Sequence, residues 1–103
     1  MIRSVRISPY TYKVLSHKGL SAAAGVLGAC ANDELHILMD PDSPPQVYYE
    51  TLLHETLHGI WNQTFLATKY SSAEEEDIIY TLTPRIVALL RDNPKLVEEL
   101  MSA

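Results

Sequence analysis

Apolar and polar residues alternate over the first fifteen residues of the chain. Val5-Arg6-Ile7 follows this alternation, and residues 10–15 are rich in types that favour β-structure. Pro9 lies between them and lacks the amide hydrogen that a paired strand donates. The pattern predicts a strand over residues 1–15 that is interrupted near Pro9 and lies at an edge or a bend of a sheet.

A second pair of apolar segments follows, at residues 25–30 and 35–40. The four residues between them, 31–34, include Asn and Asp, which favour turns. This spacing predicts a hairpin and, with the first segment, a small antiparallel sheet. Residues 20–24 lack β-branched side chains and are rich in Ala, so they are compatible with a helical turn or with a strand.

Apolar residues return with helical spacing after the breaker cluster at residues 40–45. Ser43 followed by Pro44 suits an N-cap and a first helical residue. The helix is predicted to run to about residue 63, and its apolar stripe consists of Val47, Leu53, Leu57, Ile60 and Trp61.

A second helix is predicted to begin at Ser72, because Glu75 stands three residues later, as in a capping box. Its apolar residues recur at helical spacing up to residue 90. Asp92-Asn93-Pro94 is expected to end this helix and to start a short final one over residues 95–101. The order of strands first and helices afterwards indicates the α+β class.

Length and charge narrow the range of functions. The 103 residues fit one domain, residues 1–103, with 47% hydrophobic and 20% charged residues. Acidic residues outnumber basic ones by 13 to 8, and no run of Lys or Arg occurs, so nucleic-acid binding is not expected. So small a chain with an exposed sheet edge could form a homodimer.

A cytoplasmic location is expected from the cysteine content and the chain start. The single Cys30 cannot form an internal disulfide, and the first residues lack the apolar run of a secretory signal. The most apolar stretch, residues 20–31, is shorter than the roughly 20 residues that span a bilayer, so no membrane segment is expected.

The strongest chemical signal is His54-Glu55-Thr56-Leu57-His58, an H-E-x-x-H motif inside the first predicted helix. Residues four apart lie one above the other on a helix, so His54 and His58 can offer two imidazole nitrogens to one metal ion, for which zinc is expected. Glu55 lies on the neighbouring stripe, where its carboxylate can reach a water at an open zinc position. The motif therefore predicts hydrolysis.

A catalytic zinc site needs a third protein ligand from outside this motif. The candidates by residue type are His17, His36, Cys30 and the acidic residues 74–77 that open the second helix. His17 and His36 have no partner at metal-binding spacing in the sequence, so they are not expected to bind the metal. Cys30 lies in a run of small residues and is expected to be a buried apolar side chain.

Two glutamates of the second helix remain as alternatives. A helical wheel puts Glu75 at the centre of the apolar stripe and Glu76 at its edge, which favours Glu75. The predicted capping box would instead occupy Glu75 and leave Glu76 free. Spacing alone leaves the choice between them open.

The motif helix, Glu75-Glu76-Asp77-Ile78-Ile79 and Leu90-Arg91-Asp92-Asn93-Pro94 together resemble small phage-encoded zincin-like metallopeptidases, distantly similar to ImmA/IrrE-like peptidases. The resemblance covers roughly residues 24–100. It implies that the third ligand is Glu76, which is followed by an apolar pair.

By the same resemblance the chain is a minimal zincin-like domain, with a small antiparallel sheet packed against the H-E-x-x-H helix and two further helices. The expected activity is zinc-dependent hydrolysis of peptide or protein substrates by a water that Glu55 activates, in the host cytoplasm if the protein is phage-encoded. Residues 35–40 are then expected to bind an extended peptide by strand pairing. Tyr48, Tyr49, Tyr80 and His36 are available to stabilise an oxyanion, and spacing places none of them.

A non-catalytic function is the alternative. Zinc could serve only to tie two helices together in a phage or mobile-element protein that binds a partner. A structural site more often closes its fourth position with Cys or His, and no such residue is suitably spaced on these helices, which favours the enzyme.

Overall fold

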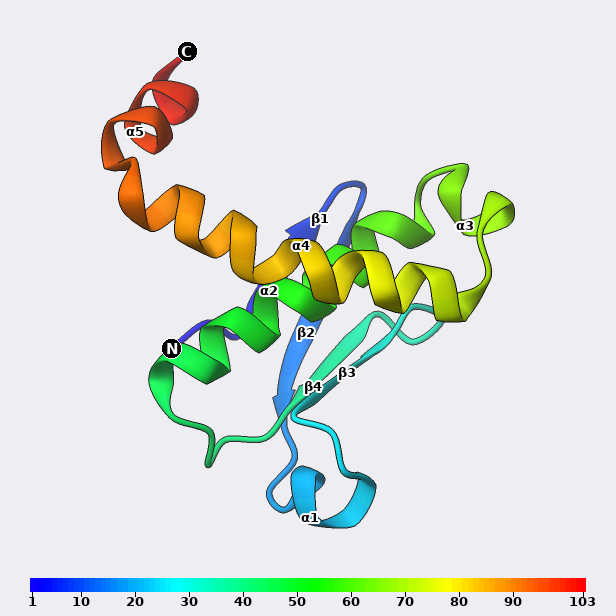
Figure 1. The fold of residues 1–103 in the computed structure, drawn as a ribbon. Coiled ribbons are helices and arrows are strands. Elements are labelled where there is room, and N and C mark those ends of the chain that lie inside the picture. The colour runs from blue at the N-terminus through cyan, green and yellow to red at the C-terminus, as the bar shows by residue number, and fades with distance from the viewer.

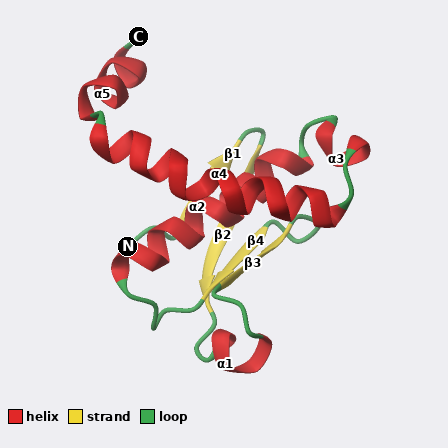
Figure 2. Ribbon diagram, viewed as in Figure 1, coloured by secondary structure: helices red, strands yellow, loops and turns green.

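A sheet with helices packed against it forms the body of the protein (Figures 1 and 2). The computed structural model describes residues 1–103, and the predicted α+β class is confirmed. The elements in chain order are β1 (Ser4–Ile7), β2 (Tyr10–Ser16), α1 (Leu20–Ala24), β3 (Gly28–Ala31), β4 (His36–Met39), α2 (Pro45–Asn62), α3 (Leu66–Lys69), α4 (Ser72–Asp92) and α5 (Pro94–Ser102).

The sheet has four strands in the order β1-β2-β4-β3. The single interrupted strand expected over residues 1–15 is wrong, because the chain reverses after Ile7 and pairs β1 with β2 in antiparallel fashion. The expected hairpin of β3 and β4 is confirmed, with Ala29 opposite Leu38. The sheet as a whole is mixed and not purely antiparallel as expected, because β2 and β4 pair in parallel. This parallel pairing is possible because α1 and β3 lie in the connection between the two strands.

Residues 20–24, compatible with either a helix or a strand in sequence, form the short helix α1. Glycines with positive φ bound it on both sides, at Gly19 (φ 79°) and Gly25 (φ 70°). These left-handed turns are accessible to glycine without a steric penalty. They allow a single helical turn to fit between β2 and β3.

The core lies between one face of the sheet and α2, which contacts β1, β3 and β4. Tyr12 and Ile37 are fully buried on this face, and the Tyr12 hydroxyl donates a hydrogen bond of 2.7 Å to Asn32 Oδ1. A buried phenol needs such a partner. The side chains of this core cluster are Ile7, Tyr12, Ile37, Met39, Tyr48 and Leu52.

α2 begins at Pro45, one residue after the predicted start, because Pro44 is the extended N-cap (φ −55°, ψ 148°). Its C-terminal end is held to the sheet by Gln63, whose side-chain amide donates to the Ile7 carbonyl at 2.9 Å. This bond fixes the C-terminal end of α2 against β1.

α4 lies across α2 (Figure 1) and forms the outer layer of the molecule. α3, a single turn between α2 and α4, was not predicted. None of the helices combines the length and the apolar character needed to cross a membrane.

Candidate metal centre

α2 places the two motif histidines one turn apart on the same face. The imidazole rings of His54 and His58 have centroids 4.9 Å apart, and their Nε2 atoms face each other at 3.2 Å. Both side chains are mostly buried, with exposed fractions of 16% and 14%. Two nitrogen donors are thus directed at one point, as the motif predicts.

The first turns of α4 bring Glu76 to the same point. One carboxylate oxygen of Glu76 lies 3.0 Å from His54 Nε2, and the other lies 2.9 Å from His58 Nε2. His54, His58 and Glu76 form the one group of three or more potential ligands in the chain that could hold a metal ion. Of the candidate third ligands, Glu76 is the residue that the structure brings into this cluster.

The spacing of the two histidine nitrogens fits a small tetrahedral ion. With bonds of about 2.0–2.1 Å, a tetrahedral zinc ion holds its ligand atoms about 3.3 Å apart. The two Nε2 atoms are 3.2 Å apart, and each lies 2.9 or 3.0 Å from a different oxygen of the Glu76 carboxylate. Two imidazoles and one carboxylate leave the fourth position of such an ion for a water molecule or a substrate.

Glu75 is bound to the opposite nitrogen of His58. The Nδ1 atom of His58 lies 2.6 Å from Glu75 Oε2. When the neutral imidazole carries its hydrogen on Nδ1, it donates this bond to Glu75, and the lone pair of Nε2 faces His54 and Glu76. Metal-binding histidines are commonly oriented by a carboxylate in this way.

The predicted capping box is shifted by one residue. Ser71 is the N-cap of α4, its hydroxyl accepts from the Glu74 amide at 3.2 Å, and Glu74 Oε1 accepts from the Ser71 amide at 3.0 Å. The prediction of Ser72 and Glu75 is therefore wrong. Because Glu74 completes the cap, Glu75 and Glu76 are both free to contact the histidines of α2.

Glu55 lies next to the cluster and is almost buried, with 7% of its surface exposed. Its Oε2 atom is 4.0 Å from His54 Nε2. Burial raises the pKa of Glu55 to about 7; the nearby His58 acts against this shift and Glu76 adds to it. A carboxylate with a pKa near neutrality can both accept and return a proton.

Burial also lowers the pKa of His54, with Glu76 opposing this shift and His58 adding to it. A lowered pKa favours the neutral imidazole. Only the neutral imidazole can donate a nitrogen lone pair to a metal ion.

An open cavity of about 720 Å³ extends from the cluster between β3, α2 and α4. Residues 26–29 form one wall, and α4 contributes Glu76, Tyr80, Thr83 and Pro84. The floor consists of the α2 residues Val47, Glu50, Thr51, His54 and Glu55.

The free edge of the sheet at this cavity belongs to β3. β4 lies between β2 and β3, so the expectation that residues 35–40 bind an extended peptide by strand pairing is wrong. Parallel pairing with β2 occupies the edge that β4 was expected to expose. Gly28 and Ala29 of β3 line the cavity instead.

Other candidate residues lie outside the cluster. His36 on β4 approaches Glu34 at 3.6 Å, and the half-buried Cys30 has its Sγ 3.5 Å from Asn32 Oδ1. Burial, with the Glu55 and Glu75 carboxylates, raises the pKa of Cys30 to about 12, so it is a neutral thiol and a poor metal ligand. Of the possible oxyanion donors, Tyr80 lines the cavity, whereas Tyr48 is buried in the core.

Glu50 in the cavity floor is a polar residue outside the H-E-x-x-H motif and outside the candidate ligands named from the sequence. It stands four residues before His54, as His54 stands four before His58. That spacing is the signal that could have identified it.

No protein-family model, no curated protein and no solved structure matches the chain.

Proposed function

We propose that the protein is a zinc-dependent peptidase of the zincin type. The observation that carries the proposal is the convergence of His54, His58 and Glu76 beside the buried carboxylate of Glu55, at the end of an open cavity. Two imidazole nitrogens and one carboxylate oxygen are donor types that suit zinc. The hydrogen bond from His58 to Glu75 supports a metal role for His58, because it directs the Nε2 lone pair to the cluster.

A zinc ion held by His54, His58 and Glu76 would supply a Lewis acid that polarises a peptide carbonyl and makes a neighbouring water more acidic. Glu55 accepts a proton from the water as its oxygen forms a bond to the carbonyl carbon. Glu55 then donates this proton to the amide nitrogen, and the carbon–nitrogen bond breaks to release an amine and a carboxylic acid, which loses its remaining proton to solvent. The Tyr80 hydroxyl, in the cavity wall, is the donor available to the carbonyl oxygen.

The free edge of β3 supports a peptide as substrate. Its unpaired backbone groups can bind an extended chain as an added strand, and Gly28 and Ala29 bring that edge into the cavity wall. A peptide bound along this edge would pass the metal cluster with its backbone aligned.

The second candidate is a non-catalytic interaction protein in which zinc ties α2 to α4. The observation that favours it is the exposed apolar surface of α5, where Leu100 and Met101 are 58% and 78% exposed. In that case Glu55 has no chemical task, and its replacement leaves function intact.

Glu55→Gln distinguishes the two candidates. We expect about one zinc ion per chain in this variant and a Tm at neutral pH no lower than that of the wild type, because Gln carries no buried charge, with cleavage of a mixed peptide library slowed by about 10²- to 10⁴-fold. Glu74→Gln is the matched control, because it makes the same chemical change in the α4 cap, where Gln also serves. Absence of zinc from the wild-type protein, or cleavage equal in Glu55→Gln and wild type, would refute the peptidase.

A further inference from the structure

Glu50 is a carboxylate in the cavity that the proposed hydrolysis does not use. It lies on α2 one helical turn before His54, so the two side chains project from the same face about 6 Å apart along the helix axis. Glu50 is half-buried and makes no hydrogen bond or ion pair within the chain. Its charge is therefore available to a ligand in the cavity.

The surroundings of Glu50 are mainly apolar. Val26, Leu27 and Val47 line the cavity with it, and Tyr80 and Pro84 of α4 contribute carbon surface. Val26, Leu27 and Val47 remain about 40% exposed, so their apolar surface is accessible to the aliphatic part of a ligand, and Glu50 beside them attracts an opposite charge. A ligand that fits this space has an apolar stem and a positively charged end.

The side chains of lysine and arginine have this form. Their aliphatic stems pack along apolar surface while the charged group reaches a polar partner. The four-carbon stem of lysine spans a distance comparable to the turn of about 6 Å that separates Glu50 from the metal cluster. A residue next to the bond being cut can thus reach Glu50 from the metal centre.

We propose that Glu50 selects substrates that present a cationic nitrogen to the cavity, with a lysine or arginine side chain packed along its apolar wall. The proposal rests on the peptidase function and names its substrate class. Acidic residues at the same substrate position are disfavoured, because Glu50, Glu55 and Glu76 all line the cavity. A free peptide α-amine offers the same cationic chemistry, and the experiment distinguishes the two sources.

The test compares zinc-loaded wild-type protein and Glu50→Gln on peptides that differ only in lysine, norleucine or glutamate at one position. Norleucine keeps the aliphatic stem of lysine without its charge. We expect wild-type kcat/KM to favour lysine over norleucine by about 10- to 100-fold, mainly through KM, and the ratio to fall towards one in Glu50→Gln. Glu50→Lys should favour the glutamate peptide, and the control Glu74→Gln should keep the wild-type ratio.

Binding supplies a readout that does not need turnover. Calorimetry on the inactive Glu55→Gln variant should give tighter binding of the lysine peptide than of the norleucine peptide, and the added change Glu50→Gln should remove the difference. To separate the two cation sources, each peptide is also compared with its amino terminus free and acetylated. A preference that disappears when the amino terminus is acetylated assigns the subsite to the α-amine. Cleavage without any preference for a cationic nitrogen overturns the role of Glu50 and leaves the peptidase intact. If the wild-type protein cleaves none of the peptides and Glu55→Gln binds none, both proposals fail.

Discussion

The hydrogen bond between His58 and Glu75 connects the histidines of the candidate metal site to the first turn of α4. At 2.6 Å it joins the Nδ1 atom of His58 to a carboxylate that is mostly buried, so the imidazole has little freedom to rotate. A fixed ring keeps Nε2 directed at Glu76 and His54. Metal affinity is then expected to depend on Glu75 although Glu75 faces away from the metal position.

We predict that Glu75→Ala weakens zinc binding by about 10- to 100-fold, because His58 loses the acceptor that orients it. Glu76→Ala should weaken binding further, since it removes a donor atom from the cluster. Competition with a chelating dye measures both, and Glu74→Gln serves as the control. If Glu75→Ala abolished zinc binding while Glu76→Ala retained it, the assignment of the two glutamates would be reversed.

Gly28 allows β3 to approach the face of α2 that carries Thr51 and Glu55. A Cβ atom at this position would lie 2.9 Å from Thr51 Cγ2, 3.2 Å from Glu55 Cγ and 3.2 Å from the Leu38 carbonyl oxygen. The first two contacts belong to side chains of α2 and the third to the neighbouring strand. Any side chain at residue 28 therefore pushes against Glu55.

Gly28→Ala is expected to destabilise the fold by about 1–3 kcal/mol through overpacking and to reduce kcat by displacing Glu55. Adding Thr51→Ser removes the methyl group at 2.9 Å and should restore part of both losses. Urea unfolding and peptide cleavage on the two single variants and the double variant measure the coupling. Strictly additive effects would show that the two side chains do not interact.

The bounds of the helices could be predicted from the sequence more closely than the directions of the strands. α2 was predicted over residues 44–63 and found at Pro45–Asn62, because a proline cluster marks its start and a continuous apolar stripe follows. Strand direction was not predictable, since alternation of apolar and polar residues is the same in parallel and antiparallel pairs. The parallel pairing of β2 with β4 depends on the path of residues 17–35, which includes the α1 segment whose conformation spacing left open.

The start of α4 shows why local pattern was insufficient at the site. Ser71 and Ser72 both have a glutamate three residues later, so the capping-box spacing fits either register. Contacts between helices distant in sequence favour Ser71, because this register leaves Glu75 and Glu76 to the histidines of α2. The placement of Glu76 among the histidines agrees with the family resemblance, whereas spacing alone left it undecided.

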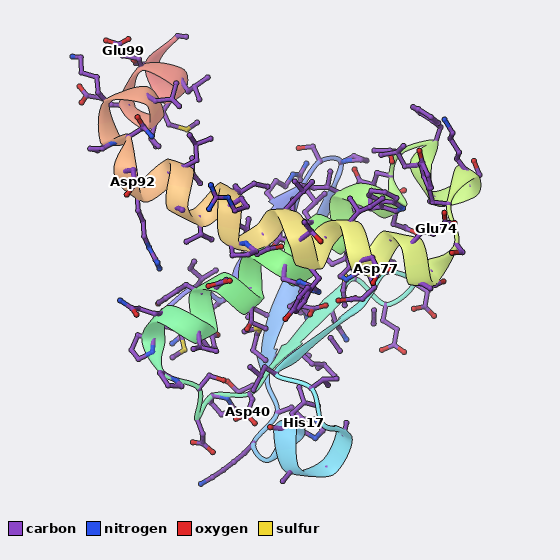
Figure 3. All side chains as sticks on the ribbon, in the orientation of Figure 1. His17, Asp40, Glu74, Asp77, Asp92 and Glu99 are labelled. Carbon is purple, nitrogen blue, oxygen red and sulfur yellow. The ribbon has the colours of Figure 1, made fainter.

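Asp40 directly follows β4 and connects this strand to α1 and to the loop before α2, at the end of the sheet opposite α4. Its carboxylate oxygens accept hydrogen bonds of 3.0 Å from the amides of Ser21 in α1 and Asp42 in the loop before α2. Figure 3 shows Asp40 and His17 close together above α1. The two amide hydrogen bonds lower the pKa of Asp40 below its ordinary value of 3.8, and His17 contributes to the same shift against the opposing effect of burial.

A lowered folded-state pKa means that Asp40 stabilises the protein above pH 3.8 and that this contribution is lost as the pH falls through the folded pKa. We predict that Asp40→Asn lowers the free energy of unfolding at neutral pH, and that the difference from wild type shrinks in acid. Urea unfolding from about pH 7 to about pH 2.5 tests this, because other carboxyl groups titrate equally in both proteins. A difference that stays constant over this range would show that the charge of Asp40 contributes nothing.

The molecule consists of a packed body and a projecting arm. The body contains the sheet, α2 and the first half of α4, whereas the end of α4 and all of α5 extend away from the sheet (Figure 1). α5 has no buried residue, and its main contacts are with α4. Buried Ile79 and Thr83 mark the part of α4 that belongs to the body.

Deletion of residues 93–103 is therefore expected to leave Tm and zinc content nearly unchanged, because little apolar surface is buried there. A longer deletion from residue 79 onwards should abolish cooperative unfolding, since it removes two buried side chains of α4. Thermal unfolding followed by circular dichroism distinguishes these cases. A large drop in Tm for the shorter deletion would mean that the arm packs against the body in solution.

The donors of the metal cluster come from two helices, with two imidazoles on α2 and a carboxylate on α4. The cluster therefore exists only in chains whose α2 and α4 are packed together, and an ion bound there selects the folded state by mass action. At a free ion concentration 100 times the dissociation constant, this linkage adds about 2.7 kcal/mol to the free energy of unfolding. The lifetime of the protein against proteases would then follow the supply of the ion around it, so that metal starvation would lower the amount of the protein in the cell.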